Sequence, residues 1–136
     1  MTRIRDSANI ISIRQKQAMG LGHAVLCGLP IVGKEPFAVL LADDLMVNQG
    51  PTILSQMVEA YTKQGRSVLA VQEVPLDQVK RYGIVAGESA GKQLIRVEQI
   101  VEKPSPEKAP SRMGVAGRYI LTPGIFDEIK NQPTGV

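Results

Sequence analysis

The chain has 136 residues, of which 43% are hydrophobic, and this suits one domain of ordinary size with a substantial core. The net charge of +3 is scattered, and the aromatic content is 4% without Trp, which argues against binding of single-stranded nucleic acid by stacked aromatic residues. The single cysteine, Cys27, excludes an internal disulfide, and we expect a buried structural thiol there. With no apolar run of membrane-spanning length and no signal-peptide pattern, we expect a cytoplasmic protein without membrane or nucleic-acid partners.

The first half of the chain alternates strand and helix patterns. The segments are a β-branched run at 9–14, a glycine loop at 20–22 before a helix that starts at His23, apolar strands at 37–41 and 67–71, and an amphipathic helix at 52–63 that ends near Gly65. Because the strands are solidly apolar, we expect an α/β fold whose parallel sheet has helices on both faces.

The second half of the chain has a different pattern. The predicted elements are a hairpin of residues 82–86 and 94–101 around a glycine-rich turn at 87–91, a proline-rich surface loop at 103–110, a strand at 113–121 and a short helix opened by Pro123 that runs through Lys130. The whole chain, residues 1–136, is expected to form a single α/β domain with an added hairpin.

Two acids, Asp43 and Asp44, follow the predicted strand at 37–41. Open α/β sheets bind ligands where their strands end, and Mg²⁺ is usually held by one or two carboxylates together with substrate phosphates. The acids therefore point to phosphate chemistry. The alternative is that they only solvate the turn or cap the next helix.

Gln15 and the loop that begins at Gly20 bring an amide and bare backbone to a predicted helix start, where N–H groups favour an anion or a base edge. A tight turn is the alternative here, and His23 is expected to pack or to cap the helix. Further along, Glu102 and Lys103 stand at a strand end before Pro104, where Lys can neutralise a phosphate and Glu can bind sugar hydroxyls. The alternative for this pair is a surface ion pair.

Five motifs in one order give the chain a family resemblance. They are Gln15 with Gly20-Leu21-Gly22-His23-Ala24-Val25, Leu41-Ala42-Asp43-Asp44, Tyr82-Gly83-Ile84-Val85, Val101-Glu102-Lys103-Pro104 and Val115-Ala116-Gly117-Arg118-Tyr119-Ile120-Leu121. With this spacing, the chain from about residue 9 onward resembles the bacterial UTP-glucose-1-phosphate uridylyltransferases of the sugar nucleotidyltransferase family. The resemblance implies a Rossmann-like nucleotidyltransferase sheet with a hairpin that helps to bind the sugar.

The resemblance also implies an activity. In this family, glucose 1-phosphate attacks the α-phosphorus of UTP, which gives UDP-glucose and pyrophosphate. The implied contacts are uracil at Gln15 and Gly20, glucose at Gly83, Glu102 and Val115, and the sugar phosphate at Lys103. Asp43 would hold the Mg²⁺ between the nucleotide and sugar phosphates and would be catalytic together with Lys103, while Asp44 is ranked below Asp43 and assigned to substrate binding.

The chain departs from the family pattern at both ends. Family members begin with a strand and a glycine-rich loop around the triphosphate, which residues 1–8 do not resemble, and a second Mg²⁺ ligand would follow Val136. We therefore expect a chain truncated at both ends that is inactive alone and folds poorly. The alternatives are a non-catalytic fragment that binds sugar nucleotide or a partner, and a related transferase such as a thymidylyltransferase; the full-length form is expected to be a homo-oligomer.

Overall fold

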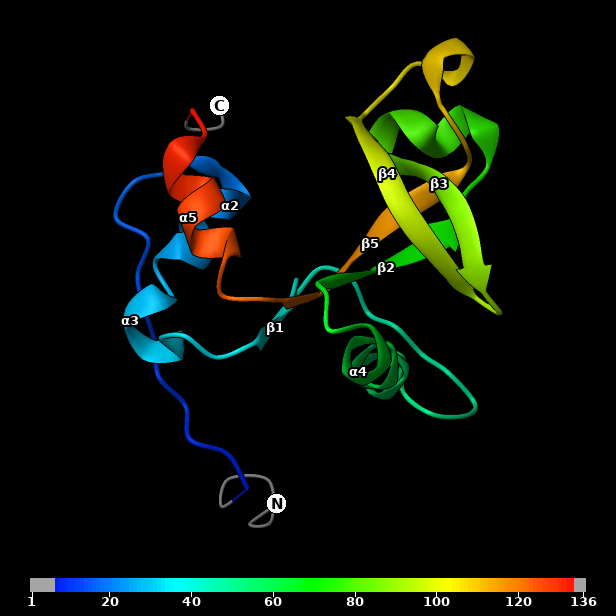
Figure 1. The fold of residues 1–136 in the computed structure, drawn as a ribbon. Coiled ribbons are helices and arrows are strands. Elements are labelled where there is room, and N and C mark those ends of the chain that lie inside the picture. Colours follow the sequence, from blue (N-terminus) through cyan, green and yellow to red (C-terminus); the bar gives the residue numbers. More distant parts are fainter. Residues whose placement is uncertain (1–6, 134–136) are drawn as a thin grey trace. The chain divides into compact units, whose positions relative to one another are not determined.

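The computed structural model describes residues 7–133, which belong to two compact units (Figure 1). The described part of the first unit comprises residues 7–36 and 123–133, and the second unit comprises residues 37–122. The single domain expected over residues 1–136 stays a prediction.

Three short helices make up the first unit: α2 at Gly20–Leu26, α3 at Leu29–Val32 and α5 at Ile125–Asn131. Helices α2 and α5 pack together, and a Cβ added at Gly22 would lie 3.7 Å from Cγ2 of Ile129. Phe126 on α5 is 2% exposed and supplies the buried aromatic side chain of this unit. The predicted helix after Pro123 is therefore confirmed.

Two predictions for the first unit are wrong. Residues 9–14 form no strand, and Ile10 is 90% exposed. A strand needs a hydrogen-bonding neighbour, and within residues 7–133 none of the strands pairs with this segment. The helix expected to start at His23 begins at Gly20 instead, so the predicted glycine loop forms its first turn.

The second unit is organised around a five-stranded sheet. Its strands are β1 at Phe37–Leu40, β2 at Val68–Glu73, β3 at Gly83–Gly91, β4 at Leu94–Glu102 and β5 at Met113–Leu121. β5 pairs with β1, β2 and β3, and β4 pairs with β3, all of them antiparallel. The last strand in the sequence is therefore the one that holds the sheet together.

The α/β fold class is confirmed, but the expected parallel pairing is wrong for the described strands. β1 and β2 are joined by helix α4, at Ile53–Gln64, and run in the same direction, as a crossover unit requires. However, β5 lies between them and is antiparallel to both. The local apolar pattern of β1 and β2 could not reveal that β5, which begins only at Met113, would separate them.

Helix α4 follows the predicted boundaries closely. Thr52 caps its N-terminus by accepting a hydrogen bond from the Ser55 N–H at 3.1 Å, and Gly65 ends it. Met57 is buried, and the helix packs against β2 and β5 (Figure 1). Its apolar stripe therefore covers the centre of the sheet.

The predicted hairpin is formed by β3 and β4, but the chain reverses at residues 92–93 and not over 87–91. The expected turn is instead part of β3, where the register shifts between Ala86 and Gly87. The 3-10 helices η1, at Leu76–Arg81, and η2, at Pro106–Lys108, flank the hairpin. Between residues 7 and 133, no helix is long and apolar enough to cross a membrane.

The buried core next to the hairpin consists of Val74, Val79 and Ile84, with Tyr82 and Ala109 packed against it. We predict that Ile84→Ala lowers the free energy of unfolding by about 3 kcal/mol, because it leaves a cavity at a side chain with no exposed surface. Urea denaturation of the chain would measure this change.

The matched control is Ile100→Ala on the neighbouring strand β4, where the side chain is 52% exposed. It should cost less than about 1 kcal/mol, because little apolar surface is lost from the interior. Equal losses from the two variants would mean that the core does not lie where the structure places it.

Candidate functional site

Three of the expected sugar-binding residues lie together in the second unit. Gly83 on β3 pairs with Glu102 on β4, and Val115 lies on the adjoining strand β5. A Cβ added at Gly83 would lie 3.1 Å from Oε2 of Glu102 and 3.7 Å from Cγ2 of Val115. The absence of a side chain at Gly83 thus leaves backbone open beside a carboxylate and an apolar wall.

Lys103 joins this cluster directly after β4. Its N–H donates to the Tyr82 carbonyl at 3.0 Å, and its φ of 45° lies in the left-handed region, where a residue with a side chain is strained. Its Nζ lies 3.5 Å from Oε1 of Glu102, so the surface ion pair that was the alternative for these two residues does form. Both side chains are mostly exposed, so this pair adds little stability and leaves both charges accessible to a ligand.

The two acids occupy a β-turn at the end of β1. The Asp44 N–H donates to the Leu41 carbonyl at 3.4 Å, which closes the turn, and the Leu41 N–H donates to the Gly117 carbonyl on β5 at 2.9 Å. Asp43 is exposed, whereas Asp44 is half-buried. A Cβ at Gly117 would overlap the Asp44 carboxylate, so this carboxylate lies against the bare backbone of β5.

Tyr119 connects the acidic turn with the sugar-binding cluster. Burial raises the pKa of its phenol above the ordinary value, and the negative charges of Asp44 and Glu102 raise it further. Val115, Gly117 and Tyr119 alternate along β5 and so share one face of the strand. That face therefore lies beside Asp44 from the turn after β1, Gly83 of β3 and Glu102 of β4.

No role for Gly117, Arg118 or Tyr119 was expected from the sequence, although they belong to one of the five motifs. The signal that could have found two of them is the two-residue period that begins at Val115, which puts Gly117 and Tyr119 on the same face as an expected sugar contact. The contacts of Arg118 run from β5 to the turn after β1, and no local pattern predicts them.

The expected uracil contacts, Gln15 and Gly20, come together in the first unit. Nε2 of Gln15 donates to the Gly20 carbonyl at 3.1 Å and to Nδ1 of His23 at 2.8 Å. Gly20 has a φ of 81°, in the left-handed region. His23 therefore orients the Gln15 amide, a role that the sequence did not suggest.

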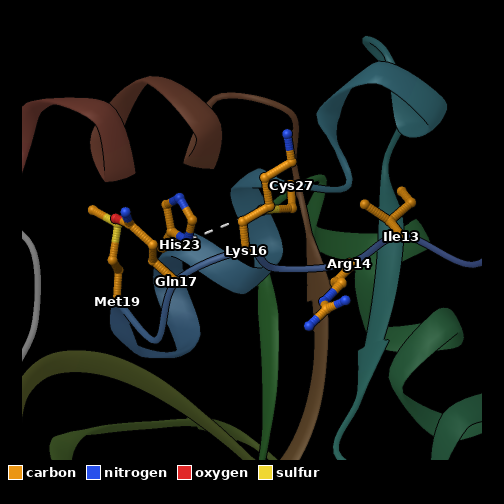
Figure 2. Close-up of a pocket in the computed structure, with 7 residues that line it drawn as sticks. All are labelled: Ile13, Arg14, Lys16, Gln17, Met19, His23 and Cys27. Atoms are coloured by element: carbon orange, nitrogen blue, oxygen red, sulfur yellow. Dashed lines mark hydrogen bonds between the residues drawn. The ribbon is translucent and has the colours of Figure 1, made fainter.

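A pocket of about 380 Å³ lies beside this network (Figure 2). Its lining residues are Ile13, Arg14, Lys16, Gln17, Met19, His23 and Cys27. Cys27 follows α2 and is half-buried, not fully buried as expected, and its Sγ lies 4.0 Å from Nδ1 of His23. Arg14 and Lys16 give the pocket a positive rim.

The acids Asp43 and Asp44 fit one mode of magnesium binding. Between residues 7 and 133, the structure contains no group of three or more His, Cys, Asp or Glu side chains that could hold a metal ion. Mg²⁺ needs no such cage, because it commonly takes one or two carboxylates and completes its shell with water and phosphate oxygens. The donor set of this turn therefore suits a Mg²⁺ ion that arrives with a phosphate ligand.

A sheet that carries an acidic turn, together with an exposed carboxylate and ammonium beside a bare glycine, is typical of enzymes that act on nucleotides and sugar phosphates. The model of the nucleotidyl transferase family matches residues 3–135, so the chain belongs to this family.

Several similar proteins are named as UTP-glucose-1-phosphate uridylyltransferases or UDP-glucose pyrophosphorylases. The chain is 48% identical over 134 residues to a UTP–glucose-1-phosphate uridylyltransferase of Pseudomonas aeruginosa and 48% identical over 130 residues to the uridylyltransferase YngB of Bacillus subtilis. These matches cover 98% and 96% of the chain, but 48% and 43% of the relatives. A solved UDP-glucose pyrophosphorylase in complex with UDP-glucose is similar with a TM-score of 0.95 and 43% identity, over 98% of this chain and 51% of that one. The chain thus spans about half the length of the relatives it matches.

The raised pKa of Tyr119 leads to a prediction. Because the folded state binds the phenolic proton more tightly than the unfolded state, the stability from this group is complete below pH 10 and declines as the pH rises above it. Asp44→Asn should lower the Tyr119 pKa by removing one of the negative charges that raise it. The tyrosinate absorbance, compared with that of a Tyr119→Phe chain, isolates the titration of Tyr119.

Asp127→Asn is the control, because Asp127 is an exposed acid on α5 that pairs with Lys130. It should leave the Tyr119 titration unchanged. If Asp44→Asn also leaves it unchanged, the acidic turn does not lie beside Tyr119.

Proposed function

We propose that this chain carries the sugar-phosphate-binding part of a UTP-glucose-1-phosphate uridylyltransferase, which makes UDP-glucose and pyrophosphate from UTP and glucose 1-phosphate. The observation that carries the proposal is the convergence of Gly83, Glu102 and Val115 beside Lys103. The names of the relatives support the same reaction.

The sugar would be held by hydrogen bonds and shape. The Glu102 carboxylate accepts hydrogen bonds from glucose hydroxyls, Gly83 lets the ring approach the backbone, and Val115 packs against the apolar side of the ring. Lys103 donates to the phosphate and neutralises part of its charge. These contacts fix the phosphate oxygen that acts as the nucleophile.

The reaction then needs no covalent enzyme intermediate. An oxygen of glucose 1-phosphate forms a bond to the α-phosphorus of UTP as the bond to the bridging oxygen breaks, and pyrophosphate leaves with that oxygen and its electron pair. The residues of the chain contribute orientation and charge neutralisation. Tyr119 stays protonated at neutral pH and offers a phenolic donor beside the two acids.

Magnesium belongs to the proposal as well. Asp43 would hold the ion, with Asp44 ranked second, and the bound ion would neutralise charge on the two phosphates. Uracil would contact Gln15 and Gly20: Nε2 of Gln15 is engaged within the protein, which leaves Oε1 to accept the uracil imide N–H. The cytoplasmic location and the homo-oligomeric full-length form stay predictions.

Two alternatives also stay open to experiment. A thymidylyltransferase would use the same acids and lysine with a different nucleotide. A non-catalytic chain would bind UDP-glucose without releasing pyrophosphate from UTP and glucose 1-phosphate. Comparison of UDP-glucose with dTDP-glucose binding addresses the first alternative, and a pyrophosphate assay addresses the second.

The central test is the titration of the isotope-labelled chain with UDP-glucose and Mg²⁺, followed by amide NMR. Wild-type resonances of Gly83 and Lys103 should shift, and Glu102→Gln should weaken binding by about tenfold or more, because a charge-assisted hydrogen bond to the sugar is lost. Glu98→Gln, at an exposed acid on the same strand, is the matched control and should bind as wild type does. A wild-type spectrum unchanged by the ligand would refute the proposed function.

The two acids are predicted to differ. Asp43→Ala should abolish the Mg²⁺-dependent part of UDP-glucose binding, whereas Asp44→Ala should weaken it less, because Asp43 is the principal metal ligand in the proposal. Calorimetry with and without Mg²⁺ measures both variants. Equal losses would overturn the ranking, and a larger loss in Asp44→Ala would make the half-buried acid the principal ligand.

A further inference from the structure

We propose that Arg118 is a positioning residue that holds the Asp43–Asp44 turn in its ligand-binding conformation by binding the backbone carbonyls at both ends of the turn. The inference rests on the proposed function, since it assigns to Arg118 the task of presenting the acids to a Mg²⁺–phosphate ligand. Neither Asp43 nor Asp44 needs to touch the guanidinium with its carboxylate for this role.

Arg118 forms hydrogen bonds to both ends of the turn. Its Nη1 donates to the Leu41 carbonyl at 2.8 Å and to the Gly117 carbonyl at 3.0 Å, and its Nη2 donates to the Asp44 carbonyl. Leu41 and Asp44 are the first and last residues of the β-turn, and Gly117 belongs to β5. One guanidinium thus joins both ends of the turn to the central strand.

The turn needs such support. Its closing hydrogen bond, from the Asp44 N–H to the Leu41 carbonyl, is long at 3.4 Å, and Asp43 in its centre is exposed. Directly after β1, the Leu41 N–H donates to the Gly117 carbonyl at 2.9 Å and so ties the start of the turn to β5. Without Arg118, the carbonyls of Leu41 and Asp44 would lose their charged donor, and the turn would sample other conformations.

Gly117 also helps to position the turn, because it has no side chain. Any side chain there would overlap the Asp44 carboxylate, so glycine lets the turn lie flat on β5 while its neighbour Arg118 binds the carbonyls. Gly117 and Arg118 thus contact the same turn at different groups: Gly117 faces the Asp44 carboxylate, and Arg118 donates to the Leu41 and Asp44 carbonyls. The pair fixes the position of the acidic turn relative to Val115 and Tyr119.

The chemistry of Arg118 favours this role over binding phosphate directly. Three of its donor contacts already go to carbonyl groups, and it takes part in none of the ion pairs found within residues 7–133. A planar guanidinium can reach two carbonyls at once, whereas the single ammonium of lysine cannot span them in the same way. Arg118→Lys therefore keeps the positive charge but removes the simultaneous hydrogen bonds to the Leu41 and Asp44 carbonyls.

The experiment compares Arg118→Lys with wild type in the full chain. Calorimetry gives the UDP-glucose affinity with and without Mg²⁺, and urea denaturation shows that each chain is folded. The gain in affinity produced by Mg²⁺ should fall by about tenfold in Arg118→Lys, while the Mg²⁺-free affinity stays within about twofold of wild type. Arg112→Lys, which alters an exposed arginine paired with Glu73 just before β5, is the control and should keep the full gain.

The outcomes separate the inference from the proposed function. A folded Arg118→Lys chain that keeps the full Mg²⁺ gain overturns the positioning role, and so does an equal loss of affinity with and without Mg²⁺, which is what a direct phosphate contact would give. A wild-type chain that binds no UDP-glucose overturns the proposed function itself. If Arg118→Lys does not fold, Arg118→Gln replaces it: a shorter neutral amide cannot reproduce the charged donors to the Leu41 and Asp44 carbonyls, so this variant must also reduce the Mg²⁺ gain, or the inference is wrong.

Discussion

The pairing of β5 with three other strands is the constraint on which the second unit depends. β1 and β2 flank its C-terminal half from opposite sides, and β3 pairs with its beginning. Because the strand is antiparallel to all three, the turn after β1 lies over Gly117, while the hairpin brings Gly83 and Glu102 to Val115. Backbone hydrogen bonds thus set the distance between the acids and the sugar-binding cluster, and rigid strands hold such groups more accurately than loops do.

The charges of the site follow from this arrangement. Asp44 lies in the turn after β1 and Glu102 ends β4, and the negative charges of both raise the pKa of the half-buried phenol of Tyr119, which burial raises most. Lys103 and Arg118 supply positive charge in different ways: Lys103 keeps an accessible ammonium beside Glu102, whereas Arg118 directs its guanidinium to carbonyls. A phosphate ligand would therefore meet the accessible ammonium of Lys103 and an acidic turn suited to Mg²⁺.

The sequence predicted the elements better than their pairing. Helix α4 and strand β5 were predicted almost to the residue, because Thr52, Gly65 and the glycines and prolines around these segments mark their ends. The antiparallel insertion of β5 between β1 and β2 was missed, since both kinds of sheet contain apolar strands. Residues 9–14 looked like a strand because β-branched residues favour one, but a strand also needs a partner. The expected sugar contacts Gly83, Glu102 and Val115 do lie together in the structure. The roles of Arg118 and Tyr119 were not predicted, because they depend on contacts between segments that are far apart in the sequence.

The most direct measurement of whether the acidic turn and the sugar-binding cluster form one site is paramagnetic broadening by Mn²⁺, which prefers the same oxygen ligands as Mg²⁺, in the presence of UDP-glucose. The amide resonances of Asp43, Asp44 and Gly117 should broaden first, those of Gly83 and Lys103 next, and those of the exposed helix surface at Glu59 and Lys63 least. Broadening centred on that helix surface, or broadening of the turn without any effect at Gly83 and Lys103, would contradict a single site built on β5.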